Sequence, residues 1–462
     1  MTATLVLPLA IAWFSAVGLV AFDGRRAWVG WTAVGALGAT FAAVARLAVS
    51  VWTDGPMASV TGGWPEGVGI TLRADALSAV FALLTAGVLL VSLLHEVLAG
   101  VRSRAFPAVV LFMTVGLTGL FLTGDIFNFY VFFEIAMISA YVVTGYGGEP
   151  RQLSAAFVFA VVNLLGSFIF LIAIAATYHV TGTLEMSGVA ERMATVEPDT
   201  VVLIAITVFV ALGVKLGLFP FHFWLPVVYA SVTPAVAAIL SGALANIGTY
   251  GVLRFGADLF PRELELGARA LIVLGTITIL YGALQAMSRR TAPEVIAYSS
   301  IGQVGYVLIA LAIGGPVGYT AAVLYSLLNA LNKALLFLAA GLRGRLVGAA
   351  FFVGAMSVAG IPPAAGFFGK LEVFQAAIEE GSAVLVGLVL LGGALSVVYL
   401  LQIYQHDFWR PAGRGIAAPQ SPAVLRGIAL AVAALVLALG LWPEPLLAAS
   451  REAAEVLVRE SR

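Results

Sequence analysis

The stretch Lys-Leu-Gly-Leu-Phe-Pro-Phe-His-Phe-Trp-Leu-Pro at residues 215–226 places a lysine, a glycine and two prolines in an otherwise apolar segment. Lipid offers no partner for the backbone groups that proline and glycine free, so such a break survives in a membrane only where protein or a hydrated cavity surrounds it. A second stretch of this kind, Gly-Ile-Pro-Pro-Ala-Ala-Gly-Phe-Phe-Gly-Lys, occupies residues 360–370. Corresponding interruptions in two halves of a chain are typical of inverted repeats in secondary transporters. We therefore predict two broken membrane helices, the seventh and the twelfth, in two inverted five-helix repeats.

The composition of the 462-residue chain is that of an integral membrane protein. Hydrophobic residues make up 61% of it and charged residues 10%, and the mean hydropathy is +1.04. Apolar segments of about 20 residues, long enough to cross a bilayer as helices, recur along the chain. About fourteen are expected, at 4–22, 27–51, 75–98, 106–123, 126–146, 154–178, 200–220, 230–253, 267–287, 294–313, 318–341, 349–376, 382–405 and 424–443. The fold class is therefore predicted to be all-α, with about fourteen transmembrane helices.

The polar stretches between these segments are short. The longest are 53–74, 179–199, 254–266 and the tail from residue 444, which we interpret as loops or surface helices. We therefore expect one transmembrane domain over residues 1–462.

Several function classes are excluded by what the sequence lacks. It has no cysteine, which removes iron–sulfur ligation by thiolates and c-type haem attachment. It has neither a phosphate-binding loop nor a dinucleotide fingerprint. Its formal net charge is zero, so no nucleic acid partner is indicated. We expect no cofactor and no metal, and the energy source should be an ion gradient or a partner subunit.

The arginines indicate the orientation. If the N-terminus lies outside, more than half of them, including Arg25, Arg410 and Arg414, fall in loops on the cytoplasmic side. Short cytoplasmic loops of membrane proteins are enriched in basic residues. We therefore predict a multi-pass protein of the cell membrane with both termini outside.

The three lysines of the chain, Lys215, Lys333 and Lys370, all lie in apolar runs. An ammonium group releases its proton more readily when it is desolvated, whereas arginine keeps its charge. Glu134 also lies within an apolar segment, where a charge costs about 2.5–3.5 kcal/mol and usually serves function. We expect Glu134 and Lys215 to compensate each other, and we predict that the four residues carry protons. A fixed structural ion pair is the alternative for Glu134 and Lys215.

For the other two lysines and for the histidine of the first break, there are also interpretations other than proton transfer. Lys333 would be a snorkelling lysine. Lys370 would form a solvated pair with Glu372. His222 would titrate near neutral pH or be a satisfied histidine in a turn.

Polar uncharged residues occupy the segments between the lysines, among them Asn246, Ser299, Gln303 and Asn329. Hydrogen bonding between helices is one interpretation, at about 0.6 kcal/mol each. The other is a chain of waters that joins the lysines laterally through the middle of the bundle.

Four motifs carry a family resemblance, at residues 122–134, 215–226, 297–306 and 360–370. They resemble the antiporter-like subunits, which include the proton-pumping membrane subunits of respiratory complex I and the large subunits of Mrp-type multisubunit cation/proton antiporters. The resemblance covers most of the chain, with a core at roughly 106–405. The form Thr-Gly-Asp-Ile-Phe-Asn before the glutamate is most similar to the D-type subunits of Mrp antiporters.

The resemblance implies a proton-translocating axis of a glutamate on the fifth helix, matched by Glu134, and lysines on the broken helices, matched by Lys215 and Lys370. The chain departs from the pattern at Asn246, where Lys or His is usual, and at Asn329, where His is common. The implied function is proton translocation in a multisubunit Na+/H+ antiporter, with other membrane subunits as partners. A membrane subunit of a complex I-related oxidoreductase and a non-conducting scaffold subunit are the alternatives.

Overall fold

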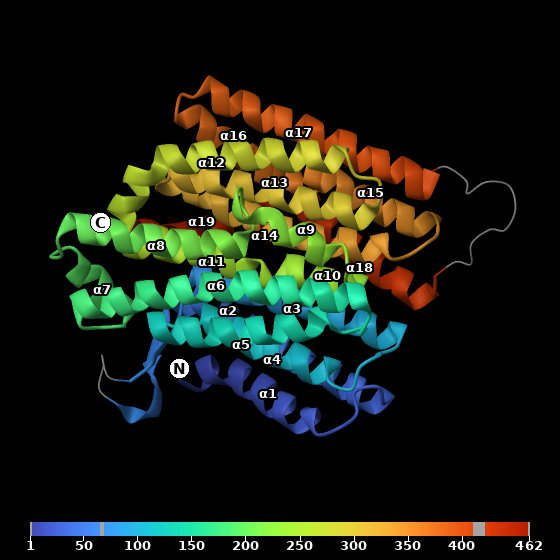
Figure 1. Ribbon diagram of the computed structural model, residues 1–462, viewed down its shortest axis with the longest axis horizontal. Helices are drawn as coiled ribbons and strands as arrows, with labels where there is room; N and C mark the ends of the chain where they lie inside the picture. The colour runs from blue at the N-terminus through green and yellow to red at the C-terminus, as the bar shows by residue number, and fades with distance from the viewer. Residues whose placement is uncertain (1, 65–68, 410–420, 461–462) are drawn as a thin grey trace, which may run out of the picture.

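The computed structural model describes residues 2–64, 69–409 and 421–460; Arg410 and Arg414 lie outside these ranges. The described chain is a bundle of helices that run mostly along one direction (Figure 1). The helices are α1 (Thr2–Val20), α2 (Ala27–Asp54), α3 (Ala76–Ala99), α4 (Phe106–Phe121), α5 (Ile126–Thr144), α6 (Pro150–Thr181), α7 (Met186–Met193), α8 (Pro198–Leu216), α9 (Trp224–Tyr229), α10 (Pro234–Ile239), α11 (Asn246–Leu253), α12 (Pro261–Met287), α13 (Ala292–Ile313), α14 (Gly315–Ala340), α15 (Arg345–Ala359), α16 (Gly366–Glu379), α17 (Ala383–Tyr404), α18 (Ala423–Leu441) and α19 (Glu444–Glu460).

Short elements complete the described chain. An antiparallel hairpin pairs β1 (Met57–Val60) with β2 (Thr71–Ala74). The remaining elements are the 3-10 turns η1 (Thr61–Gly63) and η2 (Phe221–Phe223) and the π-helical turns η3 (Leu240–Leu244), η4 (Arg254–Leu259) and η5 (Gln405–Trp409).

The prediction of an all-α membrane protein is confirmed. Twelve helical segments of the described residues are long and apolar enough to cross a membrane, and α4 and α15 are shorter apolar helices. Together these make fourteen apolar segments, although a count of fourteen crossings and the inverted repeats stay predictions.

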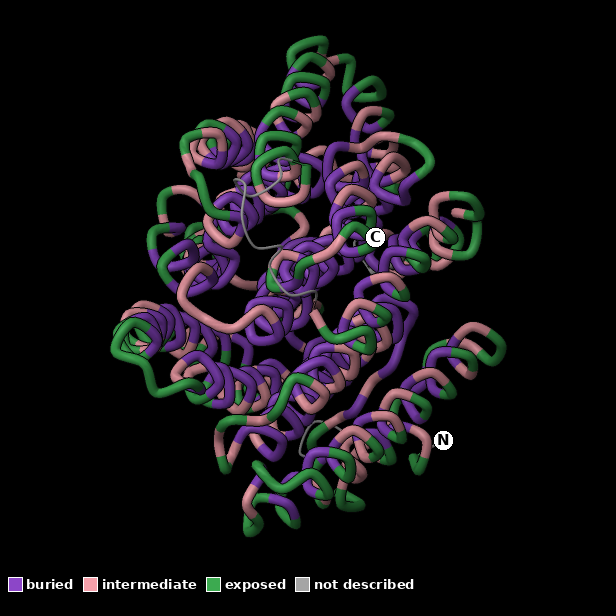
Figure 2. Tube along the Cα trace, turned by 90° about the vertical axis from the view of Figure 1, so that its right-hand side faces the viewer, coloured by how far each residue is buried: buried purple, intermediate pink, exposed green. Residues whose placement is uncertain are grey.

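Burial rises from the periphery of the bundle to its centre (Figure 2). The segments that are almost wholly buried are Pro234–Leu259, which joins α10, η3, α11 and η4, and α14. The outer helices α1 and α18 bury less than a third of their most apolar stretch. Polar residues of the central helices are thus held away from lipid.

Glycines allow two central helices to approach each other closely. A side chain at Gly282 of α12 would meet the Gly302 backbone of α13 at 2.4 Å, and one at Gly305 would meet the Gly275 carbonyl at the same distance. Small residues at such positions are the usual means of tight helix packing in membranes. This packing fixes α13, which carries two of the predicted polar residues, against its neighbours.

Both predicted helix breaks are present. The first separates α8 from α9, and its α8 end is Gly217 at φ +62°. The second separates α15 from α16 after Gly360, at φ +79°. Glycine adopts this left-handed conformation without steric cost, so both half-helices end where the sequence permits a reversal.

Candidate functional site

The backbone groups that the first break frees are satisfied by neighbouring side chains. Trp224 Nε1 donates a hydrogen bond to the Val214 carbonyl at 3.1 Å, and the Phe219 amide lies 3.3 Å from Thr278 Oγ1 of α12. Protein groups therefore satisfy part of the backbone of the break, as its position in a membrane segment requires, while Pro220 and Phe223 within it are exposed. Lys215, in the last turn of α8, is held in this protein-lined setting.

The first group of candidate residues, here called the glutamate site, consists of Glu134, Ser167 and Lys215. Lys215 is buried, and its Nζ donates to the Asn163 carbonyl of α6 at 2.9 Å and lies 3.5 Å from Ser167 Oγ. Ser167 Oγ donates in turn to Glu134 Oε1. The half-buried carboxylate on α5 and the ammonium on α8 are thus joined through one hydroxyl group on α6.

No direct ion pair between Glu134 and Lys215 is present among the described residues, and the Ser167 hydroxyl contacts both. The ammonium also lies 4.1 Å from the centre of the Phe133 ring. A hydroxyl can accept a proton on one side while it donates one on the other. The arrangement therefore permits proton exchange between the two charged groups.

The second group of candidate residues, here called the lysine-pair site, consists of Lys333, Lys370 and the polar chain that starts at Lys333. Lys333 is fully buried, so it does not snorkel, and its Nζ donates to Ser299 Oγ at 2.7 Å. The Ser299 hydroxyl lies 2.9 Å from the Tyr399 hydroxyl, which is 3.4 Å from Gln303 Nε2. A chain of side chains thus leads away from Lys333 across α13 to α17.

The same chain approaches Lys370 from the other end. Tyr325 donates to the Gln303 amide oxygen, and its ring stacks on Tyr306 with centroids 5.0 Å apart. The Lys370 ammonium lies 5.2 Å from the centre of the Tyr306 ring. Lys333 and Lys370 are therefore separated by packed polar and aromatic side chains.

Lys370 is buried beside the second break. Its Nζ donates to the Ala359 carbonyl at 3.1 Å, at the C-terminal end of α15, where the helix dipole favours a positive charge. Glu372 is half-buried, with Arg451 and Glu379 as charged neighbours. Among the described residues no hydrogen bond or ion pair joins Lys370 to Glu372, and the geometry leaves Glu372 outside the lysine-pair site.

A small cavity lies between the helices that carry Lys333 and Lys370. Its water-accessible volume is about 10 Å³, close to the least that holds one water molecule. It is lined by Gln303, Tyr325, Leu328, Asn329, Asn332, Ser357, Val358, Gly366 and Gly369. The amide oxygens of Asn329 and Asn332 are buried and have no hydrogen-bond partner among the described residues. Asn329 thus lines a cavity between the two helices that carry lysines, and its part in a chain of waters stays a prediction.

Among the described residues, the side chain of Asn246 bonds to α3 and η3 and not to a residue of the glutamate site or the lysine-pair site. Its amide nitrogen donates to Thr85 Oγ1 of α3 and to the Gly242 carbonyl of η3, both at 3.1 Å. The second bond occupies a carbonyl in the π-helical turn, whose irregular backbone leaves groups to be satisfied. Within the described part of the chain, neither bond leads to a lysine site, so the position of Asn246 supports the helix–helix interpretation.

His222 is buried in the first break between aromatic rings. It stacks on Phe219, with centroids 5.5 Å apart, and lies 4.3 Å from the Tyr281 ring. Its Nδ1 has no hydrogen-bond partner among the described residues. The structure does not bring His222 into contact with the glutamate site.

Three hydroxyl residues of the sites, Ser167, Tyr325 and Tyr399, were not predicted from the sequence. Ser167 follows Asn163 by four residues, so both occupy one face of α6, and this spacing was an available signal. Tyr399 lies in the apolar α17, where only its pairing with Ser299, 100 residues earlier, gives it a role. Serine and tyrosine are common in membrane helices, and neither residue type marks a site by itself.

A buried charge cluster was also missed, because residues 254–266 were predicted to be a loop or surface helix. Arg254 is buried in η4, and its Nη2 lies 2.8 and 2.7 Å from the two carboxylate oxygens of Asp75. It also contacts Asp258 at 3.3 Å and the Tyr250 hydroxyl at 3.2 Å. Asp75 caps α3 together with Ser78, so the cluster fastens the start of α3 to η4.

No group of three or more His, Asp or Glu side chains suited to a metal ion occurs in the part of the chain that the structure describes. The polar groups of both sites are instead lysines, hydroxyls and amides, with one carboxylate. Such groups inside a membrane bundle with broken helices are typical of ion-translocating membrane proteins.

Comparison with known proteins identifies the family. The model of the NADH:quinone oxidoreductase/Mrp antiporter transmembrane family matches residues 123–346 and 342–396. The D subunit of the Na(+)/H(+) antiporter of Alkalihalophilus pseudofirmus is 31% identical over 385 residues, which are 79% of this chain and 78% of that protein. The protein of the same name from Bacillus subtilis is 31% identical over 428 residues, 87% and 86% of the two chains. The chain belongs to this family.

Solved structures agree with this assignment. A chain of the Mrp complex from Dietzia sp. DQ12-45-1b superimposes with a TM-score of 0.90 at 29% identity, over 99% of this chain and 98% of that one. A chain of the membrane-bound sulfane sulfur reductase, an archaeal respiratory membrane complex, gives 0.89 at 27% identity, over 100% and 98%. Both similarities extend over the whole bundle.

Proposed function

We propose that this chain is the D-type, proton-translocating membrane subunit of a multisubunit monovalent cation/proton antiporter. It would lie in the cell membrane with both termini outside and with other antiporter membrane subunits as partners. Sodium is the cation we expect. The named relatives and the Mrp structure support the class, and one observation carries the role in proton transfer: the Ser167 hydroxyl contacts both Glu134 and Lys215.

In the proposed mechanism, Glu134 controls the protonation of Lys215. The carboxylate favours the charged ammonium, and its neutralisation removes that support. A proton then leaves Lys215 for the middle of the bundle. Proton movement at this site therefore alters the charge that the rest of the axis experiences.

The lysine-pair site would respond to this change of charge at the glutamate site. Two positive charges buried in one site repel each other, so protonation of Lys333 favours proton release from Lys370. The chain through Ser299, Tyr399 and Gln303 and the cavity at Asn329 would carry the proton between them. We propose Glu134, Lys215, Lys333 and Lys370 as the proton-carrying residues, and Ser299, Gln303 and Asn329 as polar residues of the path.

A second candidate function is supported by the similarity to the archaeal respiratory complex, which is nearly as high as that to the Mrp complex. In it, the chain would be a membrane subunit of a complex I-related oxidoreductase whose partners carry the redox chemistry. A scaffold without conduction is favoured only by Asn246, which is bound to Thr85.

The test is antiport by the whole complex in everted membrane vesicles. After respiration has acidified the interior, added sodium should dissipate the pH gradient, and Lys215→Ala in this chain should abolish that response at normal assembly. A complex that oxidises a soluble electron donor and pumps protons without added sodium would support the oxidoreductase candidate. An unchanged response in the Lys215→Ala complex would support the scaffold.

A further inference from the structure

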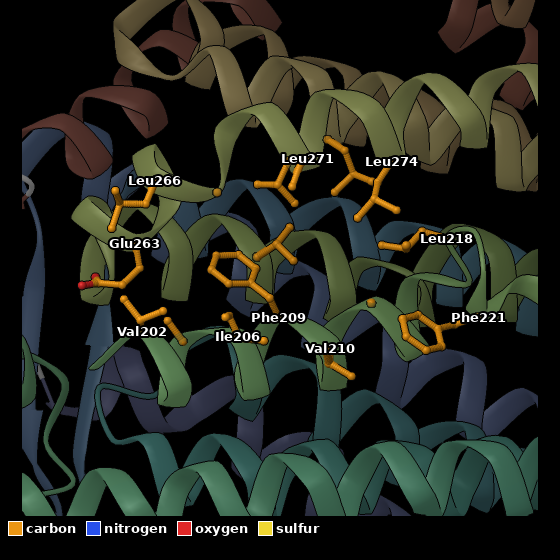
Figure 3. Close-up of a pocket in the computed structure, with 16 residues that line it drawn as sticks. Val202, Ile206, Phe209, Val210, Leu218, Phe221, Glu263, Leu266, Leu271 and Leu274 are labelled. Carbon is orange, nitrogen blue, oxygen red and sulfur yellow. The ribbon is translucent and has the colours of Figure 1, made fainter. Parts of the chain in front are cut away.

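A lateral groove runs between α8 and α12, outside the glutamate site and the lysine-pair site (Figure 3). Its volume is about 360 Å³, within the range of small-molecule sites in proteins. Val202, Ile206 and Phe209 of α8 form one wall, and Leu271 and Leu274 of α12 form the other (Figure 3). Val252 of α11 and Leu308 of α13 also line it.

The groove has the length of one membrane leaflet. It extends on α8 from Val202 to Gly213 and on α12 from Glu263 to Leu274. Eleven residues of helix correspond to about 16 Å. The hydrocarbon core of a bilayer is about 30 Å thick. Because both helices begin only a few residues before the groove, the groove runs from one membrane surface to about the midplane.

The polarity of the groove changes from one end to the other. Among the described residues that line it, Glu263 in the first turn of α12 is the one that carries a charge, and it lies at the surface end (Figure 3). The other lining side chains are apolar, and Leu218 and Phe221 of the first break close the opposite end (Figure 3). A carboxylate at the surface followed by an apolar trough matches a cationic headgroup and a hydrocarbon chain.

The helix surface around the groove is apolar and uncovered in this chain. Leu203 of α8 is 67% exposed and Leu266 of α12 is 75% exposed. In a bilayer, such a surface contacts acyl chains wherever no protein covers it. A membrane-spanning helix of a partner would need a trough across both leaflets, whereas this one ends at the break.

We propose that the groove binds one acyl chain of a phospholipid whose headgroup carries an ammonium, as in phosphatidylethanolamine. The ammonium pairs with Glu263, which would repel a lipid of purely anionic headgroup. The end of the chain rests on Leu218 and Phe221, in the segment that follows Lys215. The bound lipid thus braces the first break, a role that goes beyond the proposed transport function.

Lipid binding can be measured without reference to transport. Native mass spectrometry of the purified complex counts bound phospholipids. In Gly267→Phe the new side chain fills the groove, because a side chain at this lining position meets no atom within 4 Å. Gly387→Phe on α17 is the matched control, an equally open helical glycine outside the groove. We expect Gly267→Phe to lose one phosphatidylethanolamine per complex and Gly387→Phe to retain it.

The headgroup is tested by Glu263→Gln. We expect the preference of the Glu263→Gln complex for phosphatidylethanolamine over phosphatidylglycerol to fall about fivefold, the upper end of what one solvent-exposed ion pair contributes. An unchanged preference would overturn the assignment of the ammonium, and equal lipid counts in Gly267→Phe and the unaltered complex would overturn the site.

The occupant is identified by a photo-crosslinker attached in the Ala270→Cys variant, because the chain has no cysteine of its own. Capture of a phospholipid is the expected result. Capture of another subunit would show a protein occupant and would contradict the proposal.

Discussion

The glutamate site and the lysine-pair site stabilise a buried ammonium group in different ways. Lys215 has a carboxylate within reach through one hydroxyl. Lys333 and Lys370 have no carboxylate in an ion pair among the described residues; their ammonium groups donate to Ser299 and to the Ala359 carbonyl. The first site can therefore be neutral overall with its lysine charged, and the second cannot.

This difference indicates a division of roles. A compensated lysine holds its proton until its counter-charge changes, which suits a gate. An uncompensated pair responds to any nearby change of charge, which suits a relay. The predictions below test that division, from the largest expected effect to the smallest.

Removal of either charge of the glutamate site should have the largest effect. We expect Glu134→Gln and Lys215→Ala each to reduce sodium-driven proton transport about 100-fold or more, because the loss of one buried partner leaves the other charge uncompensated. Transport in vesicles, normalised to assembled complex, measures this. Near-normal antiport in the Glu134→Gln complex would contradict the proposal that Glu134 controls the protonation of Lys215.

Loss of the connecting hydroxyl should have a smaller effect. Ser167→Ala removes the group between Glu134 and Lys215 while both charges stay, and we expect transport to fall about tenfold. Ser167→Thr keeps a hydroxyl and serves as the control, with transport close to that of the unaltered complex. Equal rates for the two variants would show that proton exchange does not use this hydroxyl.

The polar chain of the lysine-pair site should tolerate single losses better. Tyr399→Phe deletes one hydroxyl beside Ser299, and we expect about a fivefold loss of transport, the effect of one hydrogen bond. Tyr404→Phe is a matched control on α17, since its ring packs against Phe352 and Phe408 and the hydrogen bonds described for the lysine-pair site do not involve it. A loss as large as that of Lys215→Ala would contradict the division of roles.

The smallest effect is expected at Asn246. Asn246→Leu removes the bonds to Thr85 and Gly242, so we expect about a twofold change in transport and a loss of about 1–2 kcal/mol of stability. Thermal unfolding of the complex and vesicle transport measure the two. A transport loss of about tenfold or more would place Asn246 on the proton path.

The sequence was informative where one residue alone carried the signal. Glu134 and the three lysines stand out because each places a charge in an apolar run, and the prolines and glycines at 217–226 and 360–369 mark both breaks. Ser167 and Tyr399 could not be found in this way, because their roles depend on which helices are neighbours. Arg254 was misplaced for the same reason: its partner Asp75 lies 179 residues earlier in the chain.

The same limit explains Asn246 and Asn329, which looked equivalent in sequence. One bonds to α3, and the other lines the cavity between α14 and α16. The side of the helix on which an amide lies, and what packs there, decides its role. The family resemblance predicted a polar residue at both positions. It did not predict which group each side chain would contact.

The most direct test of the central claim, that Lys215 releases its proton during transport, is antiport by the Lys215→Arg complex. Arginine keeps a positive charge near Glu134 but holds its proton at any accessible pH. We predict normal assembly and a loss of transport of about 100-fold, close to that of Lys215→Ala. Transport near that of the unaltered complex would show that the residue is only a fixed counter-charge to Glu134, and would contradict the account.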